Sequence, residues 1–220
     1  MYDRFYVSFI FEDRYLYILK GLKTTVILTL GSFILGTLLA LVFCALKRSK
    51  VKTVARIANI ICNFFVQIPT MVLLMVFVYI IFGSSTLNIL ITVIIALTIK
   101  AAAFLAGIFY TAVETVNIGE IEAARTLGMS KRQTFFGVVF PQTVTTALPL
   151  FKNQFISTLQ ETSVVGYLAI MDLTRASSII TSRTMDAFFG LLCVSVIYLL
   201  IGYIGQALLG LLGRRTHIGG

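Results

Sequence analysis

Few side chains in this sequence could carry out covalent chemistry. The single histidine, His217, lies next to the end of the chain, and no serine, threonine or cysteine forms a nucleophile–base pair. The chain has no G-x-x-x-x-G-K-S/T loop that could hold a nucleotide phosphate. Its three cysteines, Cys44, Cys62 and Cys193, are dispersed in apolar runs without a C-x-x-C pair, so we expect neither a disulfide nor a metal site. The sequence therefore predicts a protein that is not an enzyme and that binds no cofactor.

The residue with the most demanding surroundings is Lys100. It lies about 13 positions into an apolar run, hence roughly 20 Å from the outer end of that run, which is too far for its ammonium to reach the outer surface. A charge facing lipid at this depth costs at least about 2.5–3.5 kcal/mol, so we expect Lys100 to turn inward, with Glu161 as its partner. Two interpretations stay open. The pair flanks a pathway and meets the carboxylate and ammonium of a zwitterion, or it is a permanent ion pair that locks two spans.

Other small or polar residues are predicted to line the same pathway. Two of them share a helical face with Lys100, and others surround Glu161 in a stretch so rich in hydroxyls and amides that it should face protein or water. Hydrogen bonding between helices is the alternative explanation for that stretch. A polar stripe with a four-residue spacing ends at Pro69, where the missing N–H is expected to bend the helix. The predicted pathway residues are Asn63, Gln67, Lys100, Gly107, Thr111, Gln160, Glu161, Thr162 and Ser163.

A short charged stretch interrupts the apolar chain near its middle. Asn117 can cap a helix whose third residue is Glu120, and Gly128 supplies a left-handed stop. Ser130 then caps a second helix with Gln133 at its third position, which is a full capping box. We expect two short, independently capped helices that form a rigid knob.

The first of these helices has an apolar face suited to docking against another surface. Ile121, Ala124 and Leu127 fall on that face, and the small residues Ala123 and Gly128 allow close approach. A plain surface loop is one alternative, and a DNA-reading helix-turn-helix is another. The location between membrane spans argues against the second alternative.

The elements that position these residues are predicted to be membrane-spanning helices. The chain is 58% hydrophobic and only 12% charged, against about 25% charged residues in soluble domains. The net charge of +9 comes mostly from basic residues beside apolar runs, which favours membrane lipid as a partner and disfavours nucleic acid. Four apolar runs are each long enough to span a bilayer, and 134–171 is a mixed stretch. The four runs are 24–46, 54–82, 87–113 and 187–212.

Basic residues predict the orientation of the spans. The loop KRSKVKTVAR after the first run has five basic residues and no acid, and two arginines follow the last run, so both segments should be cytoplasmic. The first run must then begin outside, because the loop after it is cytoplasmic, and the last run ends inside. Such a chain crosses the membrane an odd number of times, so the mixed stretch must cross in addition to the four runs. The sequence therefore predicts an all-α integral membrane protein with five transmembrane helices. Its segments are an outer interfacial segment 1–23, a five-span domain 24–213 with a cytoplasmic loop 115–133, and a cytoplasmic tail 214–220.

The motif E-A-A-R-x-L-G-M-S, followed by F-x-x-V-x-x-P-Q, resembles the signature cytoplasmic loop of ABC importer permeases. The resemblance covers roughly residues 20–213. Among these permeases, the chain most resembles the polar-amino-acid permease family. Besides the loop, it is carried by Gly21-Leu22-x-x-Thr25, Pro69, the A-A-F-L-A of the third run, Pro149, Asn153, Phe155-Ile156 and Glu161-Thr162-Ser163.

The resemblance implies a permease subunit in the cell membrane of a bacterium that moves a polar amino acid inward. It also implies three partners: a dimeric ABC ATPase, a second permease subunit, identical or homologous, and an extracytoplasmic amino-acid-binding protein. The knob would then be a coupling helix that docks onto the ATPase. Transport of another small solute, or a membrane regulatory subunit that transports nothing, are the alternatives. The implied coupling residues are Glu120, Ile121, Glu122, Ala123, Ala124, Arg125, Leu127, Gly128 and Ser130.

The sequence departs from the family pattern where a pathway would run. Val66-Gln67-Ile68-Pro69 stands where R-G-T-P is usual, and Ala106-Gly107-Ile108-Phe109-Tyr110 stands where A-E-I-x-R is usual. Gln160-Glu161-Thr162-Ser163 replaces K-D-T-S, and Glu120 replaces a glutamine. These departures change the charge along the pathway, so the family pattern does not imply which amino acid is carried.

Overall fold

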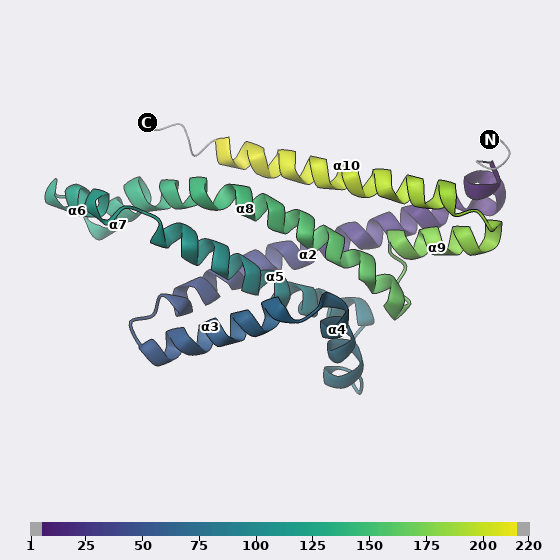
Figure 1. Ribbon diagram of the computed structural model, residues 1–220, viewed down its shortest axis with the longest axis horizontal. Helices are drawn as coiled ribbons and strands as arrows, with labels where there is room; N and C mark the ends of the chain where they lie inside the picture. The colour runs from purple at the N-terminus through teal and green to yellow at the C-terminus, as the bar shows by residue number, and fades with distance from the viewer. Residues whose placement is uncertain (1–5, 215–220) are drawn as a thin grey trace.

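The computed structural model describes residues 6–214, and all regular elements in that range are helices. Figure 1 shows an elongated bundle whose longest helices run along the long axis of the molecule. Four helices are long and apolar enough to cross a membrane, and a bent helix pair makes five if it counts as one span. The predicted all-α class is therefore confirmed. Residues 1–5 of the predicted interfacial segment and 215–220 of the predicted tail, including His217, lie outside the described part of the chain.

The first span begins before the predicted boundary at residue 23. Two short elements, η1 (Tyr6–Ile10) and η2 (Phe11–Asp13), precede α2, which extends over Tyr15–Lys47 as one helix of 33 residues. The segment 15–23 is thus continuous with the span. Nothing in its sequence breaks the helix, and Gly21 packs so closely on the backbone of another segment that these turns are held in place.

The second span is broken. α3 (Lys52–Gln67) is followed by α4 (Thr70–Met75) and η3 (Val76–Ile81), and the two parts meet at an angle of 104°. Pro69 lacks an N–H and forces the preceding residue out of the helical region, so the chain is extended at both positions of the break. The predicted bend is present and is much sharper than a kink.

The central helix of the bundle is α5 (Ile89–Glu114), which packs against both α2 and α8 (Figure 1). Ala101, Ala102 and Leu105 on α5 are completely buried. A Cβ atom added to Gly36 of α2 would lie 2.9 Å from the Cβ of Ala101, so the two helices approach very closely here. Lys100, which precedes Ala101, is therefore held at a closely packed level of the bundle.

The fourth span starts inside the predicted knob. After α6 (Ile118–Thr126), the elements α7 (Lys131–Thr134), η4 (Phe135–Val139), α8 (Phe140–Glu161) and η5 (Thr162–Leu168) form one candidate span of 38 residues. The prediction of two independent short helices is wrong for the second one. It is the first turn of the span, because no helix-stopping residue follows it.

The last two helices close one side of the bundle. α9 (Leu173–Thr184) packs between α2 and α10 (Ala187–Arg214). Asp172 caps α9 by accepting from the backbone N–H groups of Thr174 and Arg175 at 3.0 and 2.9 Å. Burial raises the pKa of the Asp172 carboxyl, and these hydrogen bonds oppose that shift. The cap fixes the start of α9 against α2.

Candidate functional site

Lys100 lies at the centre of a cluster of oxygen acceptors. Its Nζ donates to the backbone oxygen of Ile68 at 2.8 Å and to Oγ1 of Thr70 at 2.7 Å. The carboxylate oxygen Oε1 of Glu161 lies 3.7 Å from the same nitrogen. Lys100 is only 5% exposed, so the structure turns it inward and brings together the two residues that the sequence paired.

The break in the second span explains why a lysine is needed at this point. The first backbone bond of α4 runs from Leu73 N to Pro69 O, so the oxygen of Ile68 lies outside the hydrogen-bond ladder of both α3 and α4. A buried backbone oxygen without a donor is costly in an apolar environment. Lys100 supplies that donor. The link between Lys100 and the break is a contact that the sequence patterns did not indicate.

Glu161 keeps one carboxylate oxygen free. Its side chain is 17% exposed, and within residues 6–214 its Oε2 has no hydrogen-bond partner. Because this atom is enclosed, it can accept from a solute ammonium only when the surrounding helices separate. The cluster therefore offers one satisfied cation, Lys100, and one partly satisfied anion, Glu161.

Several of the predicted pathway residues are exposed polar side chains on the surfaces of three helices. Asn63 and Gln67 on α3, Thr111 on α5 and Gln160 on α8 are all exposed. Gly107 on α5 is next to open space, because a Cβ atom added there would have no neighbour within 4 Å. Unsatisfied polar groups cost several kcal/mol in lipid, so these side chains must contact water or another protein.

Two other predicted pathway residues, Thr162 and Ser163, are less exposed. Thr162 is completely buried, and its hydroxyl donates to the backbone oxygen of Leu159 at 2.7 Å. Ser163 faces α10, where it lines a second region together with Gln160. The helix changes from α to 3-10 geometry at Thr162, so consecutive residues turn away from the directions that α-helical spacing predicts.

The region beside Ser163 is a hollow of about 640 Å³ between α8 and α10. α10 contributes polar side chains to it that our sequence reasoning missed, namely Ser195, Tyr203 and Gln206. Their spacing of eight and three residues places them on one face of a helix, and that periodicity could have revealed them. The side of α8 that carries Gln160 thus faces a polar part of α10.

The opposite end of the bundle carries the knob, now defined as residues 117–133. Asn117 accepts from the N–H of Gly119 at 2.9 Å, and Ser130 and Gln133 form the complete predicted capping box. Gly128 has a φ of +86°, as its predicted role as a left-handed stop requires. Bonds from Gly128 N to Arg125 O and from Met129 N to Ala124 O complete a Schellman motif. The turn between α6 and α7 is therefore rigidly specified.

The exposed surface of α6 differs from the predicted docking face. Ala124 is buried and Ile121 half-buried, whereas Leu127 is 85% exposed and Ile118 is 70% exposed. Leu127 is the C-cap residue and follows the last residue of α6. The prediction that Ala124 lies on an exposed face is therefore wrong, because α6 packs that alanine onto α7 and η4. The exposed apolar residues are Ile118, which we did not predict, and Leu127.

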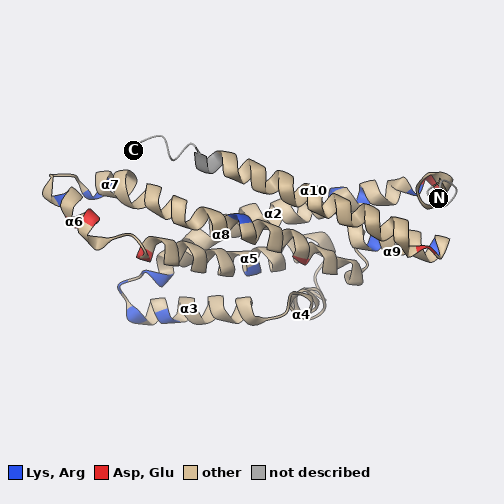
Figure 2. Cartoon of the chain, turned by 45° about the horizontal axis from the view of Figure 1, so that its top comes forward, with Lys and Arg blue, Asp and Glu red and all other residues tan. Residues whose placement is uncertain are grey.

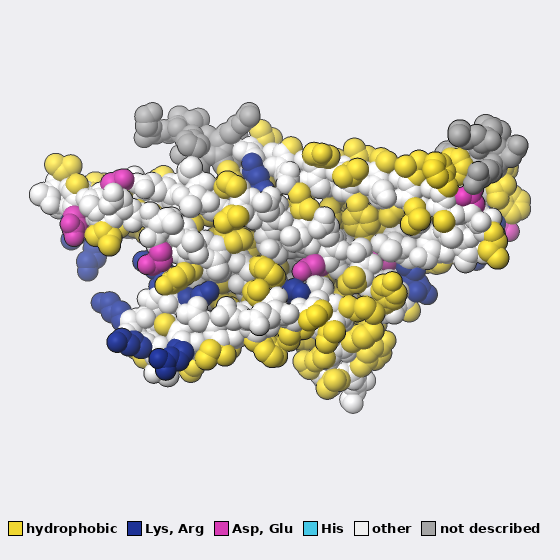
Figure 3. All heavy atoms as spheres, in the orientation of Figure 1, with side chains coloured by type: hydrophobic (Ala, Val, Ile, Leu, Met, Phe, Trp, Pro, Cys, Tyr) yellow, Lys and Arg dark blue, Asp and Glu magenta, His cyan; other side chains and the backbone are white. Residues whose placement is uncertain are grey.

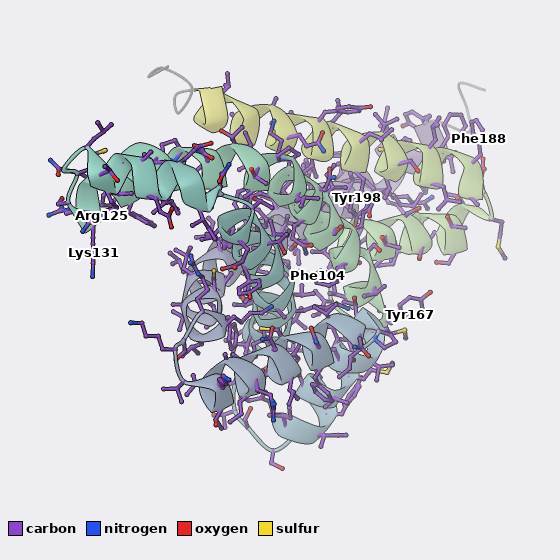
Figure 4. The ribbon with its side chains drawn as sticks, turned by 60° about the vertical axis from the view of Figure 1, so that its left-hand side comes forward. Phe104, Arg125, Lys131, Tyr167, Phe188 and Tyr198 are labelled. Atoms are coloured by element: carbon purple, nitrogen blue, oxygen red, sulfur yellow. The ribbon has the colours of Figure 1, made fainter. Side chains whose placement is uncertain are left out.

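Polar contacts hold the knob to the fourth span. The side-chain amide of Gln142 on α8 donates to a carboxylate oxygen of Glu120 on α6. Arg125 donates to the backbone oxygen of Met129 at 2.6 Å. Figure 4 shows Arg125 and Lys131 extending from this end, far from Phe104 in the centre of the bundle. Besides the large apolar side chains of Ile118 and Leu127, the residues Glu122, Ala123 and Arg125 are exposed on α6, so they are available to a partner.

Basic residues gather at the end of the molecule that carries the knob. In Figures 2 and 3, lysine and arginine residues at the start of α3 lie at the same end as α6 and α7. Arg48, in the loop after α2, forms an ion pair with Glu114 at the end of α5, with a distance of 3.4 Å. The basic loop between α2 and α3 and the knob therefore share one end of the bundle.

The profile of one protein family, the binding-protein-dependent transport system inner membrane components, matches residues 32–218. The chain belongs to this family. The matched segment contains the spans from the middle of α2 onward, the knob and the Lys100–Glu161 cluster.

Similar proteins agree with this membership. The permease is 27% identical over 201 residues to the probable amino-acid permease protein YxeN of Bacillus subtilis (strain 168), with 90% of each chain covered. It is 29% identical over 213 residues to the histidine/lysine/arginine/ornithine transport system permease protein HisM of Salmonella typhimurium, covering 92% of this chain and 90% of the relative. A crystal structure of an amino acid ABC transporter with histidines matches with a TM-score of 0.78 at 30% identity, over 90% of this chain and 94% of that one. The chain is thus an ABC permease of the polar-amino-acid type.

Proposed function

We propose that this chain is the membrane-spanning subunit of an ATP-driven importer that translocates a polar amino acid delivered by an extracytoplasmic binding protein. The observation that carries this proposal is a continuous connection between two sites. The 38-residue span that contains Glu161 begins at the knob, roughly 45 Å away from Glu161 along the helix. A movement imposed on the knob is therefore transmitted to the polar cluster at membrane depth.

The chain has five spans in this proposal, with the N-terminus outside and the C-terminus in the cytoplasm. The gathering of basic loops at the end that carries the knob supports this orientation through the positive-inside rule. The bent pair of α3 and α4–η3 then counts as one crossing. α9 lies at the outer end, where a binding protein would deliver its solute.

The knob docks onto a separate ATPase subunit. Its two exposed apolar side chains, Ile118 and Leu127, are the anchors that would enter a groove of that partner, and the exposed charges of Glu122 and Arg125 surround them. Ala124 supports the docking helix from within. The chain thereby receives the energy of ATP hydrolysis from another protein.

Glu161 receives the ammonium of the amino acid, and Lys100 positions the site. The Lys100 ammonium donates to two oxygens of the chain, and its Nζ lies 3.7 Å from Oε1 of Glu161, so it has little capacity left for a solute carboxylate. The free Oε2 of Glu161 is the complementary acceptor. This assignment differs from the symmetrical expectation in which both residues bind the zwitterion.

A second permease subunit covers the exposed polar surface of α3, α5 and α8. Two such surfaces facing each other would enclose a polar pathway, and lipid could not cover them without a large cost. The hollow between α8 and α10 extends the polar lining toward Gln206.

Reconstitution of the whole complex tests the proposed function. The permease is purified with its co-expressed ATPase and binding protein, and ATP hydrolysis is measured with and without candidate amino acids. We expect hydrolysis to rise only when the binding protein carries its amino acid, and the labelled amino acid to accumulate in the compartment that corresponds to the cytoplasm. Equal stimulation without any solute would support a regulatory subunit instead, and accumulation of a different class of solute would contradict the substrate assignment.

A further inference from the structure

An apolar groove of about 530 Å³ lies near the end of the bundle that carries the knob. Its walls come from α2, α5, the start of α8 and α10, with Leu41, Phe109, Phe135, Phe140 and Ala147 among the lining residues. The groove is open along one side, because Leu41 is 56% exposed and both Phe135 and Phe140 are more than 40% exposed. An open groove of this size and lining accepts an apolar chain.

The groove faces away from the proposed solute pathway. On α8, the residues that line it, such as Val144 and Ala147, lie on the opposite side of the helix from exposed Thr145, Thr146 and Asn153. The adjoining face of α2 exposes only apolar residues at this level, with Leu38 and Val42 both more than half exposed. A wholly apolar helix face next to the groove is suited to contact with lipid.

A basic rim lies at one end of the groove. Arg48 is itself a lining residue, and its side chain is 44% exposed. Lys47 precedes it and lies over the ring of Tyr110 at 5.4 Å, and the next loop adds exposed Lys50 and Lys52. Glu114 is the acid at this rim, and its carboxylate contacts Nε of Arg48. The other N–H groups of the Arg48 guanidinium remain for a further anion. An apolar groove with a basic rim at the cytoplasmic interface is complementary to an anionic phospholipid.

We propose that this groove is a binding site for an anionic phospholipid, whose acyl chain lies along Leu41, Phe109 and Ala147 and whose headgroup phosphate contacts Arg48. The assignment of this lipid to the cytoplasmic leaflet rests on the membrane orientation given in the proposed function. The binding site itself does not depend on that orientation. Because the groove joins α2, α5 and the first turns of the fourth span, a bound lipid stabilises the helices next to the knob.

The absence of tryptophan from the sequence allows a direct test. A single tryptophan is introduced as Phe109→Trp in the groove or as Val42→Trp on the lipid-facing side of α2. The full chain is reconstituted in phosphatidylcholine vesicles that contain either brominated phosphatidylglycerol or brominated phosphatidylcholine, and quenching of the fluorescence is measured. We expect Phe109→Trp to reach half-quenching at a mole fraction of brominated phosphatidylglycerol at least three times lower than that of brominated phosphatidylcholine. Val42→Trp should respond equally to both.

Two charge variants in the Phe109→Trp background locate the headgroup. Arg48→Gln should abolish the preference for phosphatidylglycerol, whereas Lys23→Gln removes the same charge near the opposite end of α2 and should retain it. Equal quenching of Phe109→Trp by both lipids would overturn the proposal, because it indicates ordinary lipid contact. A lack of quenching would overturn it too, since it indicates that a second copy or another segment of the chain fills the groove. Neither readout depends on amino-acid transport, so failure here is separable from failure of the proposed function.

Discussion

The ammonium of Lys100 on α5 lies 3.7 Å from a carboxylate oxygen of Glu161, the last residue of α8. The same nitrogen donates to the backbone of Ile68, where the second span breaks. One side chain therefore joins three spans at a buried level of the bundle. Movement of α8 at Glu161 is mechanically coupled to the orientation of α4 through this contact.

Removal of the ammonium tests the positioning role of Lys100. Lys100→Met leaves the oxygen of Ile68 without its donor and the Glu161 carboxylate without its cation, and breaking such a buried pair costs about 3–5 kcal/mol. We expect a clearly lower midpoint of thermal unfolding in detergent and a large loss of transport, whereas Lys152→Met on α8 serves as the control. The double variant Lys100→Glu with Glu161→Lys should not recover, because a glutamate at position 100 cannot donate to Ile68. Full recovery of stability in the double variant would show that the pair is an ordinary ion pair.

Glu161→Gln tests whether the free oxygen binds the solute. Glutamine keeps the shape of the side chain and can still accept from Lys100, but it lacks the charge that attracts an ammonium. We expect the KM for the transported amino acid to rise at least tenfold in reconstituted vesicles, with a smaller loss of thermal stability than in Lys100→Met. An unchanged KM would exclude Glu161 from solute binding.

Substitution of Gly128 tests whether the knob couples the ATPase to the spans. Its φ of +86° is strongly disfavoured for a β-branched residue, so Gly128→Val should redirect α6 and reduce ATPase stimulation at least tenfold while membrane insertion persists. Gly128→Asn is the matched variant, since asparagine tolerates this conformation and should retain most of the coupling. Normal stimulation in Gly128→Val would mean that the knob is not the coupling element.

Substitution of two helical glycines distinguishes a role in helix packing from a role in the solute pathway. A Cβ atom at Gly21 on α2 would lie 2.6 Å from the backbone oxygen of Asp172, whereas one at Gly107 on α5 would have no neighbour within 4 Å. Gly21→Val should therefore separate α2 from α9 and destabilise the protein by about 1–3 kcal/mol, measured by chemical unfolding in detergent. Gly107→Val should leave stability nearly unchanged but lower the transport rate. Equal loss of stability in both variants would contradict the open space beside Gly107.

Cysteine labelling tests the orientation. In a background without Cys44, Cys62 and Cys193, single cysteines replace exposed residues at both ends of the bundle. A membrane-impermeant maleimide should label Ser84→Cys and Ser178→Cys in intact cells, but Thr126→Cys only after the membrane is opened. Labelling of Thr126→Cys from outside would reverse the proposed topology.

The sequence by itself determined the features that depend on residues close together along the chain. Apolar runs of sufficient length predict the spans, because a residue that faces lipid must be apolar regardless of which helix packs nearby. The caps at Asn117 and Ser130 and the left-handed Gly128 were predictable for a similar reason, since their hydrogen bonds reach only a few residues along the chain. The inward orientation of Lys100 followed from the cost of a charge in lipid alone.

Only the tertiary structure decided which surfaces those elements present to one another. It showed that Lys100 serves the break at Ile68 in addition to Glu161, that α3 and α4 meet at 104°, and that Ala124 is buried while Ile118 is exposed. It also buried Thr162 and placed Ser163 together with Gln160 beside α10. These outcomes depend on contacts between residues that are far apart in the sequence, and on a change of helix geometry at Thr162. Local spacing places a residue on a face of its helix, but the packing of several helices decides what that face meets.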